Sequence, residues 1–121
     1  MSELEIIYRN DLSTRLLQRG YNVYLPVHDV GIDLIAHRES DNDLKLVQQK
    51  SRWGIFKKYI GRGIWLAFRD EPDWFLLPHD DMVNWEETAR YLETPSWRDK
   101  GHYHQPHLST AIRARCLPFL I

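Results

Sequence analysis

The chain has 121 residues, of which 43% are hydrophobic, 12% aromatic and 27% charged, the composition of one globular domain. This excludes a mainly disordered chain, and the single cysteine, Cys116, excludes a disulfide framework or a zinc site built on cysteines. No apolar run approaches the ~20 residues of a membrane span, and the N-terminus has no export-signal pattern. We therefore expect a cytoplasmic protein that does not contact membranes.

The formal net charge is −1, but the charges are unevenly distributed. Between Leu44 and Arg69 there is no Asp or Glu, and this segment carries seven of the 16 basic residues. The remainder of the chain is acidic. A strongly basic segment suits a polyanionic partner such as nucleic acid. The alternative is a solvated basic face that acidic neighbours neutralise in space.

The first half of the chain predicts a helix followed by three strands. Apolar residues recur at near-helical spacing over residues 2–19, and Gly20 supplies a C-terminal stop. The apolar positions of this helix are Ile6, Leu12, Leu16 and Leu17. Strands are predicted over residues 21–26, 32–37 and 44–51, the last two joined by a polar hairpin loop.

The second half predicts two further strands and two helices. Residues 53–60 fit either a short helix or an extended continuation, and residues 63–69 and 74–77 predict strands. A helix is expected from about residue 80 to 93, then a polar loop, then a helix over residues 108–117. The order predicts an α/β fold with a mixed central sheet, comprising a core over about residues 1–93 and a C-terminal extension over about 94–121.

Three polar side chains are predicted to converge on the central strands. Asp33 interrupts an apolar strand, where an unsatisfied carboxylate is costly. Gln48 and Lys50 lie two residues apart on the next strand and therefore on the same face. This combination suits phosphodiester hydrolysis. The carboxylate and amide oxygens can hold a hard divalent cation, and the lysine can orient water or offset developing charge.

Three sequence segments resemble the PD-(D/E)XK nuclease superfamily, which includes restriction endonucleases and Holliday-junction resolvases. They are Arg19-Gly20-Tyr21-Asn22-Val23, Gly31-Ile32-Asp33-Leu34-Ile35-Ala36 and Leu46-Val47-Gln48-Gln49-Lys50-Ser51. The resemblance implies a restriction-endonuclease-like αβββαβ core, here followed by C-terminal helices. It also implies an endonuclease that cleaves DNA with Mg²⁺ or Mn²⁺. The DNA is expected to be double-stranded or branched, and the small chain is expected to act as a homodimer.

The resemblance also assigns residues. Asp33 matches the metal-binding aspartate and Lys50 the lysine, while Gln48 occupies the position of the usual Asp or Glu and Ile32 that of the proline. The metal ligands it implies are Asp33, Gln48 and the backbone carbonyl of Gln49. Many members carry a glutamate on the first helix near the metal. Glu5 is the candidate for this role and Glu3 the second choice.

Several alternatives remain open from the sequence. Asp33 and Lys50 could form a purely structural ion pair, and the glutamine at the carboxylate position also fits a degenerate site in a nucleic-acid-binding or assembly module. The DNA-contacting residues expected from the acid-free segment are Arg52, Lys57, Lys58 and Arg62. Aromatic residues interleave with them, which suits stacked bases but equally an amphipathic segment. The run His102-x-His104-x-x-His107 has no supporting carboxylate beyond Asp99, which disfavours a metal site there.

Overall fold

A computed structural model describes residues 1–121. Its helices and strands are α1 (Glu3–Gln18), β1 (Asn22–Tyr24), β2 (Leu34–Arg38), β3 (Asp43–Lys50), β4 (Trp53–Phe56), β5 (Ile64–Asp70), β6 (Asp73–Pro78), α2 (His79–Asn84), β7 (His102–Gln105) and α3 (Thr110–Cys116). Short 3₁₀ segments occupy Lys57–Tyr59, Glu86–Glu93 and Leu117–Phe119, and a π-helical turn occupies Ser96–Lys100. None of the helices combines the length and apolarity needed to cross a bilayer.

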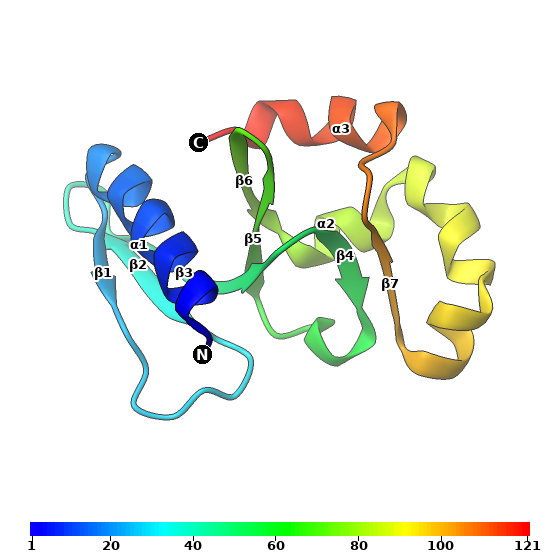
Figure 1. The fold of residues 1–121 in the computed structure, drawn as a ribbon, viewed down its shortest axis with the longest axis horizontal. Helices are drawn as coiled ribbons and strands as arrows, with labels where there is room; N and C mark the ends of the chain where they lie inside the picture. Colours follow the sequence, from blue (N-terminus) through cyan, green and yellow to red (C-terminus); the bar gives the residue numbers. More distant parts are fainter.

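The central sheet has five strands in the order β1-β2-β3-β5-β6. Strands β3 and β5 are parallel and the other neighbours are antiparallel, so the sheet is mixed as predicted. A second sheet pairs β4 with β7. Figure 1 shows α1 and β1–β3 at one end of the molecule and the β4–β7 ribbon, with the helical turns of Glu86–Glu93 and Ser96–Lys100, at the other.

The helix α1 covers one face of the sheet. Ser2 caps its N-terminus by accepting a hydrogen bond from the Glu5 backbone N–H at 3.2 Å. Leu12 and Leu16 are fully buried in a cluster with residues of β2, β3, β5 and β6. Ile6 and Leu17, which the sequence also placed on the apolar face, are exposed, because only one narrow stripe of the helix reaches the sheet.

A second hydrophobic cluster lies under the β4–β7 ribbon and the C-terminal helices. Trp53 of β4 and Phe68 of β5 are buried there, and the C-terminal segment contributes Trp97, Ile112 and Cys116. The segment after residue 93 therefore supplies part of the core.

The connection from β3 to the parallel strand β5 departs from the αβββαβ pattern. A parallel pair needs a crossover, and the family pattern places a helix there. Here residues 53–56 form β4 and residues 57–59 a single 3₁₀ turn. Of the two alternatives for residues 53–60, the extended one therefore holds for the first half.

Two C-terminal predictions need correction. The helix expected over residues 80–93 is broken at Trp85, whose extended backbone separates α2 from a 3₁₀ segment. The loop expected after residue 94 contains the π-helical turn and β7. Strand β7 pairs with β4, about fifty residues earlier in the chain, so no local pattern marks it.

Candidate active site

Asp33 lies beside the end of β3. It occupies the bend directly before β2, and its backbone N–H donates to the Val47 carbonyl at 2.8 Å, next to the Leu34–Val47 pair with which the β2–β3 ladder begins. Gln48 and Lys50 lie two residues apart on β3 and therefore project to the same face. The backbone thus brings Asp33 next to the strand that carries Gln48 and Lys50.

A cavity of about 460 Å³ lies at this end of β3. All five residues predicted for catalysis or metal binding line it, namely Glu5, Asp33, Gln48, Gln49 and Lys50. The first turn of α1 forms one wall, and the loop before β2 forms another.

Asp33 is a buried carboxyl, with only 8% of the residue exposed. One oxygen, Oδ2, accepts the Gln49 backbone N–H at 2.8 Å. Burial, followed by the neighbouring Asp29 carboxylate, raises the pKa of Asp33 to about 6. The carboxylate has no ion pair with Lys50, so the alternative of a structural Asp33–Lys50 pair does not describe this site.

The Gln48 side chain has an unpartnered oxygen in the same cavity. The residue is 9% exposed, and its Oε1 atom is buried without a hydrogen-bond donor. Its Nε2 atom makes only a long 3.4 Å contact with the Gln49 carbonyl. A buried polar atom without a partner costs about 1–3 kcal/mol, and a bound cation would satisfy it.

These oxygens fit a hard cation. Asp33 offers a carboxylate, Gln48 an amide oxygen and Gln49 a backbone carbonyl, the oxygen donors that Mg²⁺ takes up in proteins. The structure has no group of three or more His, Cys, Asp or Glu side chains placed to hold a metal. Any cation here would therefore depend on neutral oxygens as much as on charge.

Asp29 is a further cavity residue that the sequence did not single out. It lines the same cavity, and its Oδ1 atom accepts the Gly31 backbone N–H at 2.8 Å. That hydrogen bond, followed by one from the Asp33 carboxyl, lowers the pKa of Asp29. Asp is so common in turns that its position two residues before Gly31 carried no signal. Asp29 places a second carboxylate at the site.

Lys50 lies against aromatic side chains. Its Nζ atom is 4.6 Å from the ring centre of Phe56 and 5.6 Å from that of Tyr59. Burial, followed by repulsion from Lys58, lowers the pKa of Lys50, while the carboxylates of Asp33, Asp29 and Glu5 oppose the shift. An ammonium with a lowered pKa is suited to exchange protons or orient water.

Glu5 contributes to the cavity chiefly through its backbone. Its carbonyl oxygen accepts the Gln49 Nε2–H at 3.2 Å, and its carboxylate accepts the Ser2 hydroxyl at 3.1 Å. The Glu5 carboxylate therefore caps the start of α1 at the mouth of the cavity. Glu3, the second choice for the helix-one acid, is exposed and does not line the cavity.

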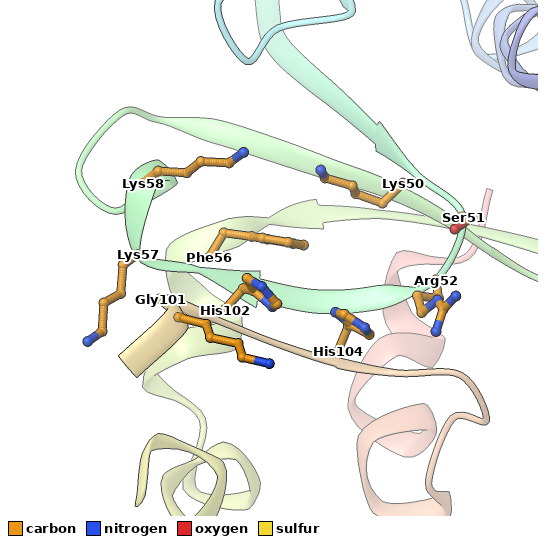
Figure 2. Close-up of a pocket in the computed structure, with 10 residues that line it drawn as sticks. Lys50, Ser51, Arg52, Phe56, Lys57, Lys58, Gly101, His102 and His104 are labelled. Carbon is orange, nitrogen blue, oxygen red and sulfur yellow. The ribbon is translucent and has the colours of Figure 1, made fainter. Parts of the chain in front are cut away.

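The predicted DNA-contacting residues divide into two groups. Arg52, Lys57 and Lys58 line a second pocket of about 590 Å³ together with Lys50, and Figure 2 shows this pocket. Arg62 lies elsewhere. One Nη atom donates to the Val30 carbonyl at 2.7 Å, so Arg62 holds the loop that carries Asp29.

Comparison with known proteins supports the fold. No family model matches the chain, and no curated protein matches it. Among solved structures, the chain is similar to the bacterial homing endonuclease I-Ssp6803I with a TM-score of 0.53 and 18% sequence identity, over 94% of this chain and 81% of the other. The match confirms the fold expected from the sequence segments. The chain has a mixed α/β, restriction-endonuclease-like fold.

Proposed function

We propose that the protein is a Mg²⁺-dependent endonuclease that hydrolyses phosphodiester bonds in DNA. The observation that carries the proposal is the buried, unpartnered Gln48 Oε1 atom, which shares a cavity with Asp33 and Lys50. A buried oxygen without a hydrogen-bond donor, next to a carboxylate, suits a position that binds a cation. A glutamine with a purely structural role would have a hydrogen-bond partner for its amide oxygen.

Each cavity residue has a role in this proposal. Asp33, Gln48 and the Gln49 carbonyl would hold Mg²⁺ or Mn²⁺, which would lower the pKa of an attacking water and offset charge on the phosphate. Asp29 would supply the negative charge that Gln48 lacks. This contribution would compensate for the neutral glutamine at this position.

Lys50 would act on the reacting groups. Its ammonium lies on the same strand face as Gln48, where it can orient the water or stabilise the developing negative charge. Glu5, at the cavity mouth, would add further negative charge. Arg52, Lys57 and Lys58 would contact the DNA backbone, and Arg62 would act through the Asp29 loop. One such site cuts one strand, so cleavage of both strands calls for a homodimer.

A nicking assay tests the proposal. Supercoiled plasmid and branched DNA are incubated with the purified protein and Mg²⁺ or Mn²⁺, and the parent is expected to convert supercoiled plasmid to nicked circles. Asp33→Asn and Lys50→Ala should not, while His107→Ala, an exposed residue outside both cavities, should behave as the parent.

Absence of cleavage by the parent at every metal concentration would overturn the endonuclease proposal. Retained DNA binding in that case would favour the other candidate, a nucleic-acid-binding or assembly module with a degenerate site.

A further inference from the structure

The second pocket is built from two distant parts of the chain. One side comes from the end of β3 and the turn after β4, where Lys50, Arg52 and Lys58 lie. The other side comes from the C-terminal segment, which contributes Lys100 and His102, with His104 further along β7. The antiparallel pairing of β4 with β7 brings these two sides together.

The cations of this pocket are not neutralised. Of the acid-free segment, Lys45 pairs with Asp43 and Arg69 with Glu71 at 2.8 Å, outside the pocket. Arg52, Lys58 and Lys100 have no ion pair, and the pocket lining contains no acidic residue. Figure 2 shows the side-chain nitrogens of Lys50 and Lys58 pointing toward one another across the pocket. Like charges held this close favour an anion between them.

Two histidines complete the pocket. The rings of His102 and His104 stack at 5.4 Å with 12° between their planes, and His102 also lies 6.3 Å from the Phe56 ring. The Nδ1 atom of His102 is buried without a hydrogen-bond partner. Gly54 faces His104 across the β4–β7 ladder, and a side chain there would lie 3.0 Å from the His104 Cβ atom. The absence of a side chain at Gly54 therefore leaves the space that His104 occupies beside His102.

The basic pocket adjoins the candidate active site. Lys50 and Ser51 line both cavities, so a DNA strand with one phosphate near Asp33 would continue over Lys50 into the basic pocket. We infer that this pocket binds a backbone phosphate of the DNA strand next to the one cut, with Lys100, His102 and His104 as ligands that the C-terminal segment adds. The inference rests on the proposed choice of DNA as substrate.

The chemistry of the pocket fits a phosphate group. Lysine and arginine supply charge, and imidazole nitrogens supply directional donors. Partial desolvation, followed by the charges of Arg52, His102 and Lys50, lowers the pKa of His104, and an anion bound in the pocket would oppose that shift. Lys58 and Lys100 are the other charged groups of the pocket lining near the ring.

DNA binding without metal tests the inference. Fluorescence anisotropy of a labelled duplex in EDTA compares Lys100→Ala/His104→Ala with Arg90→Ala/His107→Ala, a control in the same third of the chain with the same formal charge change. The pocket variant should bind about tenfold more weakly, and the slope of its salt dependence should fall by about 0.9 for each phosphate that it no longer neutralises. The control should match the parent. Equal affinities for the two variants would overturn the inference.

A second experiment distinguishes a phosphate of the DNA backbone from a free phosphate ion. Calorimetric titration with inorganic phosphate should show no saturating heat for the parent, because the pocket is open to solvent and the inference assigns it to one phosphate of a strand that other cations also hold. Saturable phosphate binding that the pocket variant loses, together with unchanged DNA binding, would assign the pocket to a free anion and overturn the inference.

Failure of the pocket inference and failure of the endonuclease proposal give different experimental results. Asp33→Asn should keep DNA affinity in EDTA while losing cleavage. A parent that binds DNA through the pocket but never cuts it would overturn the endonuclease proposal alone. A parent that cuts DNA while the pocket variant binds normally would overturn the pocket alone.

Discussion

The two cavities at the end of β3 share a wall and differ in chemistry. The cavity on the α1 side is lined by three carboxylates and by the amides of Gln48 and Gln49, whereas the basic pocket on the β4–β7 side is lined by cations and imidazoles with no acid. Lys50 and Ser51 line both. The end of β3 therefore separates a cavity lined by acidic groups from a pocket lined by basic groups, although the net charge of the whole chain is only −1.

The largest expected effect follows from removing the Asp33 carboxylate from the cavity on the α1 side. Asp33→Asn keeps the shape of the side chain but removes the buried charge, so Mg²⁺ or Mn²⁺ binding should disappear. Removing a carboxyl that is costly to ionise should leave the protein folded and no less stable. Metal titration by calorimetry and thermal unfolding measure the two quantities. A parent-like titration of the variant would contradict the assignment of Asp33.

Lys50 is expected to show the next largest effect, because it belongs to both cavities. Lys50→Ala should slow cleavage by roughly 10²–10³-fold, the range seen when a group stabilising transition-state charge is removed. DNA affinity in EDTA should fall by much less, since other cations remain in the pocket. Comparing cleavage rate with anisotropy separates the two losses. Equal losses in both would place Lys50 in binding alone.

Substitutions of Gln48 test whether the cavity on the α1 side binds a metal ion. Gln48→Glu replaces a neutral ligand with a charged one, so it should tighten metal binding and support cleavage at lower Mg²⁺. Gln48→Ala should lose activity without unfolding. If the site were degenerate, Gln48→Glu would instead leave metal affinity unchanged and destabilise the protein by burying an uncompensated charge. Calorimetry with both variants distinguishes these cases.

The smallest expected effect concerns His79, which contacts Phe56 of the basic pocket. Its Nε2 atom accepts the Phe56 backbone N–H at 2.9 Å, and burial lowers the pKa of this ring below its usual value of 6.5. A lowered folded-state pKa means that the contribution to stability is present above about pH 6.5 and is lost as the pH falls. The free energy of unfolding should therefore decrease on acidification. His79→Gln should remove part of this decrease, measured by urea unfolding across pH.

The sequence predicted the parts of the fold that local pattern controls. Helix α1, the β2–β3 hairpin and the shared strand face of Gln48 and Lys50 follow from apolar spacing, turn residues and the period of a strand. The fold class is confirmed by the structural match. The assignment of site residues stays a prediction, although the structure places all five of them around one cavity.

What the sequence did not predict depends on distant contacts. The β4–β7 pairing joins segments with no shared pattern, so the histidines of β7 gave no indication that they line a pocket with Lys50. Arg62 looked like one more surface cation, but its contact with the Val30 carbonyl directs it to the Asp29 loop. The helix expected over residues 80–93 breaks at Trp85, where buried neighbours hold the chain. The Thr88 hydroxyl donates a hydrogen bond back to the Met82 carbonyl at 2.6 Å.

The pairing of β4 with β7 also sets the order in which the two cavities can form during synthesis. The cavity on the α1 side is built from residues that leave the ribosome early, the last of them Ser51. The basic pocket is incomplete until His104 has been made and docked. A chain that ends before β7 would contain every residue that lines the cavity on the α1 side, but it would lack His102 and His104 of the basic pocket and the core residues Ile112 and Cys116. Completion of the basic pocket therefore coincides with completion of the second hydrophobic cluster.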